Sequence, residues 1–286
     1  MEEVSRVAKT QRFETRGSET QGSETQGSEA TRPIVLGAAP AGATDSSSAA
    51  RAVREMFTSI APRYDVLNHV LSFNVDRLWW RRTARTFAHI LAGPDTRILD
   101  LCCGTGDMTF ALLKQAGRHD QQIVSADFSH AMLQRAYSKT CGKIEQNGNI
   151  AAPRWIEADA LCLPFPRNHF NLVTSAFGFR NLADYDAGLR EIARVLKPGG
   201  ECGILDFSDP KGLMGRLYRI YFKQVLPQVG TMISGVRGPY AYLPNSVERF
   251  PQPEEMLDRM RRAGFREASW TPYTFGIAGL YRGKKD

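Results

Sequence analysis

Short apolar runs alternate with segments of helical periodicity through the central part of the chain. The apolar runs predict five strands, at Ile98–Cys102, Ile123–Asp127, Arg154–Ala158, Phe170–Phe177 and Glu201–Phe207. The segments between them predict helices at Met108–Lys114, Ser129–Lys139 and Asp184–Leu196. Strands separated by helices indicate an α/β fold with a mainly parallel, doubly wound sheet, in which ligands bind at the carboxyl ends of the strands. The last segment, Gly264–Arg282, predicts a C-terminal antiparallel hairpin.

Three further helices are predicted outside this alternation. Apolar residues recur at helical spacing from Val53 to Ile60, and Pro62 ends that helix. Lys211–Leu226 predicts a basic, strongly apolar helix after the fifth strand. It could be a lid for an apolar substrate over the ligand end of the sheet, or an ordinary packed helix. Pro253–Ala263 predicts the last helix.

A helix starting at Arg77 combines aromatic and basic residues. One stripe of this helix carries Trp80, Ala84, Phe87 and Leu91, and the neighbouring face carries Arg77, Arg81 and Arg85. Such a face suits a nucleic acid or a lipid surface. A helix that simply packs its tryptophans and exposes its arginines to water fits the pattern as well.

The first 48 residues differ from the rest of the chain. Gly17–Gln21 is repeated as Gly22–Gln26, and the stretch that follows is rich in Ala, Gly, Pro and Ser. So few apolar residues cannot offset the entropy lost on ordering, so we expect residues 1–48 to be disordered. The sequence thus predicts one folded domain over residues 49–286.

Composition narrows the class of protein. A chain of 286 residues with 42% hydrophobic residues is long enough for one well-buried domain. The net charge of +7 is compatible with an acidic partner, a nucleic acid or an anionic membrane surface, or with solubility alone. The five cysteines form no C-x-x-C pair and the five histidines have no metal-ligand spacing, so we expect neither a disulfide framework nor a metal site. No signal peptide is recognisable and no apolar run is long enough to span a membrane, which favours a cytoplasmic location.

A glycine turn follows the first strand directly. Gly104 and Gly106 permit backbone torsions that a side chain would forbid and let a ligand approach the main chain. The helix that follows offers unpaired N–H groups to a nucleotide. Asp100 ends the strand and Asp107 lies in the turn, and acids suit a ligand with a cationic amino-acid end better than a pyrophosphate. S-adenosylmethionine is such a ligand, although the turn alone is also compatible with another nucleotide.

Two more strand ends carry acids. Asp127 ends the second strand 21 residues after Gly106, where an acid can hold both hydroxyls of a ribose. Asp159 and Ala160 follow the third strand, in a loop able to hydrogen-bond an adenine edge. Each aspartate could instead only cap a helix or turn, but the three in order favour a nucleoside site.

Seven motifs in order give the chain a close family resemblance. They are Ala61-Pro-Arg-Tyr-Asp65, Leu99-Asp-Leu-Cys-Cys-Gly-Thr-Gly-Asp107, Ala158-Asp-Ala-Leu-Cys-Leu-Pro-Phe165, Phe177-Gly-Phe-Arg-Asn181, Arg194-Val-Leu-Lys-Pro-Gly-Gly200, Phe250-Pro-Gln-Pro-Glu-Glu255 and Ala263-Gly-Phe265. Together they resemble the ubiquinone/menaquinone biosynthesis C-methyltransferase family over residues 50–283. The glycine turn and Lys-Pro-Gly-Gly are shared by many class I methyltransferases, whereas the first and fourth motifs are far more particular.

The resemblance implies a Rossmann-like methyltransferase that uses S-adenosylmethionine to methylate a ring carbon of a polyprenylated quinol. Matched by motif, Thr105, Asp127, Asp159 and Ala160 would contact the cofactor. The leading substrate is demethylmenaquinol. The ubiquinone precursor, a 2-methoxy-6-polyprenyl-1,4-benzoquinol, is the alternative, and an RNA methyltransferase is a more distant one that lacks the expected clamp for a flipped base.

Such a reaction indicates roles for four residues. A quinol carbon becomes nucleophilic when the neighbouring hydroxyl loses its proton, which calls for a base and for a cation beside the phenolate. Asp107 is the candidate base and Arg180 the candidate phenolate partner, with Asn181 and Tyr64 positioning the ring or a water molecule. Alternatively, Asp107 only caps a helix and Arg180 pairs with a carboxylate such as Asp184.

The expected partners follow from that substrate. We expect the polyprenylated quinol and no nucleic acid, with weak, salt-sensitive contact to the inner face of the cell membrane through the Arg77–Arg85 and Lys211–Lys223 segments. A homodimer is compatible with the sequence.

Overall fold

The computed structural model describes residues 42–65, 74–117, 122–147, 152–210 and 239–286, and single positions 37, 38, 40, 72, 212, 215, 224 and 228. The helix α1 (Ser46–Ile60) begins with a capping box, in which Asp45 accepts from the Ser48 N–H at 2.7 Å and the Ser48 hydroxyl accepts from the Asp45 N–H at 3.1 Å. The predicted boundary at residue 48 therefore falls in the first turn of α1. Residues 1–36 of the predicted tail, and most of the predicted helix Lys211–Leu226, lie outside the described residues.

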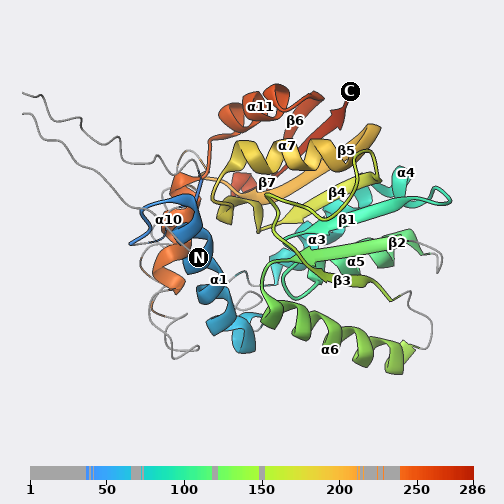
Figure 1. The fold of residues 1–286 in the computed structure, drawn as a ribbon, viewed down its shortest axis with the longest axis horizontal. Helices are drawn as coiled ribbons and strands as arrows, with labels where there is room; N and C mark the ends of the chain where they lie inside the picture. Colours follow the sequence, from blue (N-terminus) through green and yellow to red (C-terminus); the bar gives the residue numbers. More distant parts are fainter. Residues whose placement is uncertain are drawn as a thin grey trace, which may run out of the picture. The chain divides into compact units, whose positions relative to one another are not determined.

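One sheet of seven strands organises the fold, in the order β3-β2-β1-β4-β5-β7-β6 (Figure 1). The strands are β1 (Arg97–Leu101), β2 (Gln122–Asp127), β3 (Arg154–Glu157), β4 (Phe170–Ala176), β5 (Leu196–Phe207), β6 (Phe265–Tyr273) and β7 (Ala278–Lys285). The first five pair in parallel, and β7 is antiparallel to both β5 and β6. The predicted α/β class, with a doubly wound sheet and a C-terminal antiparallel hairpin, is confirmed.

Adjacent residues of the central strands enter opposite layers of the core, because side chains alternate along a strand. Val173 and Ile204 pack in the cluster that contains residues of α7 (Tyr185–Val195) and α11 (Pro253–Arg262), two helices on the same side of the sheet in Figure 1. Their neighbours Leu172 and Leu205 pack on the other face. That face is covered by α3 (Val75–Thr86), α4 (Ala88–Leu91) and α5 (Asp107–Ala116). Because helices cover both faces of the sheet, the central strands have apolar residues at consecutive positions and not only at alternate ones.

Three local features differ from the prediction. The expected helix from Arg77 is two helices that part at Phe87, whose buried ring fills the space beside Gly203 on β5. The segment Lys197–Gly200, which precedes the predicted strand Glu201–Phe207, is an irregularity within β5, where Leu196 pairs with Phe170 but Glu201 already pairs with Leu172. The helix α10 (Pro239–Arg249) was not predicted, and Pro244 lies inside it.

The remaining described helix, α6 (His130–Asn147), extends beyond the predicted Ser129–Lys139. None of the described helices is long and apolar enough to cross a membrane.

The chain order of the strands reverses between β1 and β4. From β1 the chain moves outward to β2 and β3, and then returns to β4 on the other side of β1. Open α/β sheets bind ligands in a crevice at the carboxyl ends of the strands beside such a reversal, here β1 and β4.

Candidate active site

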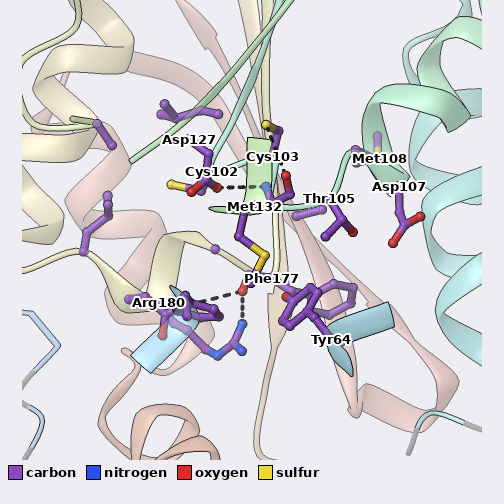
Figure 2. Close-up of a pocket in the computed structure, with 18 of the residues that line it drawn as sticks. Tyr64, Cys102, Cys103, Thr105, Asp107, Met108, Asp127, Met132, Phe177 and Arg180 are labelled. Atoms are coloured by element: carbon purple, nitrogen blue, oxygen red, sulfur yellow. Dashed lines mark hydrogen bonds between the residues drawn. The ribbon is translucent and has the colours of Figure 1, made fainter. Parts of the chain in front are cut away.

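A cavity of about 410 Å³ lies at the crevice between β1 and β4 (Figure 2). All of the predicted site residues line it except Gly106. Its walls are largely apolar and include side chains that the sequence analysis did not single out, namely Trp79, Phe128, Met132, Phe177 and Phe207. An apolar cavity with a few convergent polar groups is typical of a small-molecule site.

The two strand ends that flank the crevice have strained backbones. Cys102 after β1 and Phe177 after β4 have φ angles of 54° and 58°, a left-handed conformation that is costly for residues other than glycine. The two loops also approach closely, since a Cβ at Gly178 would lie 2.3 Å from the Cβ of Cys102. Only glycine fits at this crossing, so the Phe177-Gly178 pair fixes the shape of the crevice.

Gly106 has a packing role in the glycine turn. It is the residue before α5, has a φ of 88°, and a Cβ there would lie 2.6 Å from the ring of Trp155. The positive φ angle and the closeness of Trp155 explain why glycine is needed at this position. The contact between Gly106 and a cofactor remains a prediction. Gly104, in contrast, lines the cavity and donates its N–H to Asp127 Oδ2 at 2.8 Å.

Asp127 is buried at the end of β2 and is held from two sides. Besides Gly104, the Ser129 N–H donates to its Oδ1 at 2.9 Å. Burial raises the pKa of Asp127 to about 6, although these backbone hydrogen bonds oppose the shift. Each carboxylate oxygen keeps a lone pair, so the group can still accept hydrogen bonds from a ligand in the cavity.

Asp100 lies at 0% exposure beneath the turn. Thr109 donates to its Oδ2 at 2.6 Å and Thr174 to its Oδ1 at 2.9 Å. Burial raises the pKa of Asp100 to about 7, opposed by these hydroxyls, and the nearby Asp127 raises it further. The carboxyl thereby ties α5 and β4 to β1, and it lines the cavity from below.

The loop after β3 contributes the third predicted strand end. Asp159 accepts from the Leu161 N–H at 2.9 Å, and Ala160 is buried. Both line the cavity, as predicted for groups that face an adenine edge.

A polar cluster links the glycine turn to α6. Lys139 on α6 lies 3.1 Å from Asp107 Oδ1, 2.9 Å from Thr105 Oγ1 and 2.8 Å from Asp65 Oδ1. Thr105 also donates to Asp65 Oδ1 at 2.5 Å. Asp65 follows Tyr64 directly, so the cluster holds that ring against the cavity. The sequence did not predict Lys139 as a site residue, because its partners lie about 30 and 70 residues away in the chain.

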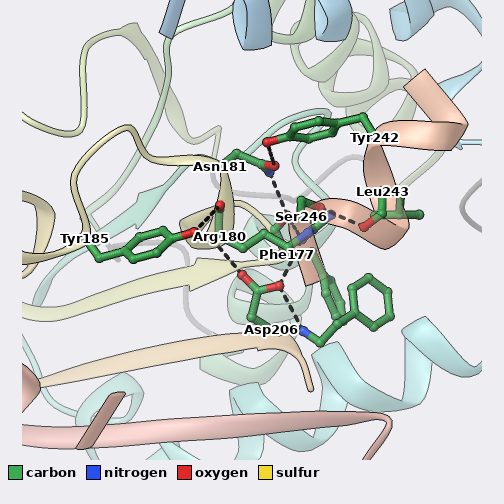
Figure 3. Close-up of polar contacts among 9 residues, drawn as sticks. Phe177, Arg180, Asn181, Tyr185, Asp206, Tyr242, Leu243 and Ser246 are labelled. Atoms are coloured by element: carbon green, nitrogen blue, oxygen red, sulfur yellow. Dashed lines mark hydrogen bonds and ion pairs between the residues drawn. The ribbon is translucent and has the colours of Figure 1, made fainter. Parts of the chain in front are cut away.

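Arg180 forms a buried ion pair with Asp206 at the end of β5 (Figure 3). Its Nη1 lies 2.9 Å from Asp206 Oδ1 and also donates to the Phe177 carbonyl, and its backbone N–H donates to Asp206 Oδ2 at 3.0 Å. The alternative prediction that Arg180 pairs with a carboxylate is thus confirmed, but the partner is Asp206 and not Asp184, which caps α7 by accepting from the Ala187 N–H at 2.9 Å. Burial raises the pKa of Asp206, and the guanidinium opposes the shift.

One donor of Arg180 remains unused within the described part of the chain. The residue is 5% exposed and lines the cavity, yet its buried Nε finds no hydrogen-bond partner among the described residues. An orphaned, buried charged donor is costly. Five other buried side-chain atoms of the described residues share this condition, Arg282 Nε among them, so the candidate role of Arg180 depends on its place in the cavity wall.

Two tyrosines that the sequence analysis missed support this loop. Tyr242 on α10 donates to Asn181 Oδ1 at 3.2 Å, and Tyr185 on α7 donates to the Arg180 carbonyl at 3.0 Å. Burial raises the pKa of Tyr242 to about 12, so its hydroxyl stays protonated and acts as a donor. The network fixes Arg180 on one wall of the cavity, with Thr105 and Asp107 across from it (Figure 2), and Asn181 also lines the cavity.

Comparisons with known proteins identify the family of this chain. Residues 44–285 match the model of the ubiE/COQ5 methyltransferase family. The chain is 47% identical to a demethylmenaquinone methyltransferase of Deinococcus radiodurans, covering 84% of this chain and 95% of the relative. It is 48% identical to one of Thermus thermophilus, covering 80% and 100%. It is also 42% identical to the ubiquinone/menaquinone biosynthesis C-methyltransferase UbiE of Geobacter sulfurreducens, covering 82% and 88%.

Solved structures support the fold. A SAM-dependent methyltransferase of Thermotoga maritima superposes with a TM-score of 0.56 at 18% identity, covering 82% of this chain and all of the other. The [4+2]-cyclase SpnF superposes with a TM-score of 0.59 at 17% identity, covering 87% and 98%. At this identity only the Rossmann-like class I methyltransferase fold is shared. The match to the family model over most of the chain, with the two relatives near 48% identity, shows that this chain belongs to the ubiE/COQ5 methyltransferase family.

Proposed function

We propose that this enzyme methylates a ring carbon of a polyprenylated quinol, demethylmenaquinol, with S-adenosylmethionine as the methyl donor. The observation that carries the proposal is the buried Arg180–Asp206 pair, which holds a guanidinium group on the wall of the cavity that also contains the glycine turn. The names of the relatives from Deinococcus and Thermus support menaquinone as the product.

The residues on the β1–β2–β3 side of the cavity fit the cofactor. Asp127 offers a buried carboxylate to the ribose hydroxyls, Asp159 and Ala160 face the adenine, and Thr105 and Asp107 present oxygens beside the start of α5. When bound, S-adenosylmethionine supplies a methyl group on a sulfonium that is already activated for displacement. The protein therefore has to align the reactants and raise the nucleophilicity of the ring carbon.

The opposite wall fits the quinol head group. Asp206 holds Arg180 on the cavity wall, and its guanidinium can stabilise a phenolate, which increases electron density on the neighbouring ring carbon. Asn181 and Tyr64 flank this position and can orient the ring or a water molecule. Asp107 carries the carboxylate that can take the hydroxyl proton, directly or through one water molecule.

Asp127→Ala should weaken binding of S-adenosylmethionine by roughly a hundred- to ten-thousandfold. The change removes two charge-assisted hydrogen bonds of about 1.5–3 kcal/mol each. Asp127→Glu should lose less affinity because it keeps an acceptor. Titration calorimetry measures both variants, and wild-type affinity in the alanine variant would show that Asp127 does not hold the ribose.

Cofactor affinity should fall as the pH is lowered from 7 to 5. The pKa of Asp127 is raised to about 6, so its carboxylate is charged above this pH and takes up a proton below it. A protonated carboxyl cannot accept two hydrogen bonds from a ribose, so affinity should fall by up to about tenfold per pH unit below 6. Asp100, whose pKa is raised to about 7, is another buried acid of the site, and the Asp127→Asn variant separates the contributions of Asp100 and Asp127. Calorimetry should show that cofactor affinity declines more steeply with falling pH in the wild type than in Asp127→Asn. Equal slopes in the two proteins would contradict the assignment of Asp127 to the ribose.

The ubiquinone precursor remains the second candidate substrate. Its support is the name of the UbiE relatives, at 42% identity in Geobacter sulfurreducens and 40% in Shewanella frigidimarina. Mass spectrometry of the quinones in cells lacking the gene separates the two. Demethylmenaquinone should accumulate, whereas accumulation of the benzoquinone precursor would identify the alternative and unchanged quinones would exclude both.

The polyprenyl chain of the substrate indicates where the enzyme works. A quinol with such a chain resides in the bilayer, so we place the enzyme in the cytoplasm, in peripheral contact with the inner face of the membrane. A homodimer is compatible with this arrangement.

A further inference from the structure

Two of the largest exposed apolar side chains lie on neighbouring segments. Among the described residues, the large apolar side chains with high exposure are Leu78 at 61%, Tyr137 at 62% and Phe275 at 78%. Leu78 lies on α3, and Phe275 lies in η4 (Thr274–Gly276), between β6 and β7. Tyr137 lies apart from them on α6. Trp79 Nε1 donates to Thr274 Oγ1 at 2.8 Å, so the residues adjacent to Leu78 and Phe275 are in direct contact.

The turn that carries Phe275 holds it outward in a strained conformation. Thr274 and Phe275 have φ angles of 45° and 57°, two consecutive left-handed residues that are not glycine. Each such residue costs on the order of 1–3 kcal/mol. The turn is held by the Trp79 hydrogen bond and by Ser208, whose hydroxyl donates to the Gly276 carbonyl at 2.6 Å. A fold that accepts strain to expose a phenylalanine indicates a function for that side chain outside the core.

The exposed face of α3 is basic. Arg77, Arg81, Arg82 and Arg85 are exposed, and the acid of this helix, Asp76, is buried. None of the four guanidinium groups forms an ion pair with a carboxylate in the part of the chain that the structure describes. Arg82 stacks on the ring of Tyr273 with its Cζ 4.2 Å from the centroid, which joins this face to η4.

This basic and apolar surface borders the cavity. Val75 and Trp79 of α3 line the cavity, as do Thr274 and Ile277 beside Phe275. Exposed arginines that have no carboxylate partner among the described residues, lying around exposed apolar side chains, are complementary to a bilayer. Its anionic headgroups can bind the guanidinium groups, and its acyl chains can bury the apolar side chains. The same elements thus form the cavity wall on one side and the exposed surface on the other.

We propose that α3 and η4 form a docking surface for an anionic lipid bilayer, with Phe275 and Leu78 inserted among the acyl chains and Arg77, Arg81 and Arg85 on the headgroups. This inference rests on the proposed function, in which the quinol reaches the cavity from the bilayer. It adds the surface that meets the lipid and the orientation of the cavity toward it. Docking through these residues brings the cavity wall next to the source of the substrate.

Co-sedimentation of the full chain with vesicles tests the surface. The wild type should bind vesicles containing phosphatidylglycerol at low salt and bind pure phosphatidylcholine at least tenfold more weakly. Phe275→Asn should weaken binding about tenfold, and Arg77→Gln with Arg81→Gln should remove most of the charge selectivity. Asparagine tolerates left-handed torsions, so Phe275→Asn should not lower the melting temperature. Tyr137→Asn is the matched control and should bind like the wild type.

Three results would overturn the proposal. They are the absence of wild-type binding at low salt, an equal loss of vesicle binding in Phe275→Asn and Tyr137→Asn, and a wild-type dimer in sedimentation velocity that Phe275→Asn dissociates.

Activity on a short-chain, water-soluble demethylquinol without vesicles separates this inference from the proposed function. Phe275→Asn should match the wild type in that assay and fall behind it when a long-chain quinol is supplied in vesicles. Equal activities of the two proteins in both assays would contradict the docking surface, and an inactive wild type in the soluble assay would contradict the proposed function alone.

Discussion

Arg180→Ala should lower kcat for quinol methylation by about a hundred- to a thousandfold while the Kd for S-adenosylmethionine changes little. Asp206 fixes the guanidinium on the wall of the cavity, so it is the group placed to stabilise a phenolate. Loss of one preorganised donor to a developing oxyanion costs on the order of a hundred- to a thousandfold in rate. Single-turnover kinetics with saturating cofactor measures the effect.

Stability has to be controlled in this experiment. Removing Arg180 leaves Asp206 as an uncompensated buried charge, which costs about 3–5 kcal/mol. The double variant Arg180→Met with Asp206→Leu removes the charge as well and should recover much of the stability but none of the activity. If Arg180→Ala, shown to be folded and cofactor-bound, turned over at the wild-type rate, Arg180 would not act on the phenolate.

Asp107→Asn should lower kcat by about a hundred- to ten-thousandfold, the range expected for loss of a general base. Asparagine keeps the size of the side chain and its hydrogen bond to Lys139, but it cannot take a proton. The pH profile should change too, because the limb that reports ionisation of the base should disappear. Rates of the folded, cofactor-bound variant across pH 5–9 provide the measurement.

Lys139 supplies the control for Asp107. Its ammonium lies 3.1 Å from Asp107 and 2.8 Å from Asp65, so Lys139→Met removes the cation but leaves the carboxylate in place. This variant should retain the acidic limb of the profile and lose far less activity than Asp107→Asn. Equal losses in the two variants would assign the cluster to positioning of the turn and would argue against a base at Asp107.

Local patterns were sufficient to predict the fold and the position of the site. The apolar runs have the length of buried strands, and the helices between them force parallel pairing, so the carboxyl ends that carry Asp100, Asp127 and Asp159 meet at one edge. The hydrophobic pattern did not predict the break at Phe87, because that break depends on the space that Gly203 leaves on a distant strand.

Contacts between distant segments could not be predicted. Asp206 is 26 residues from Arg180 and reaches it because β4 and β5 are neighbours in the sheet. An acid inside the apolar strand Ile204–Phe207 was nevertheless a signal, since a buried carboxylate needs a partner. Lys139 gave no such signal, because a lysine on an amphipathic helix is ordinarily solvated.

The most direct test of the central claim is the transfer of a labelled methyl group by the purified protein. The protein is incubated with reduced short-chain demethylmenaquinol and S-adenosylmethionine that carries a labelled methyl group, and the quinone is fragmented in a mass spectrometer. The proposed function predicts one labelled methyl on a ring carbon of each product, formed in equal amount with S-adenosylhomocysteine. An unchanged quinol in the presence of cofactor-bound protein, or a label found on oxygen, would contradict it.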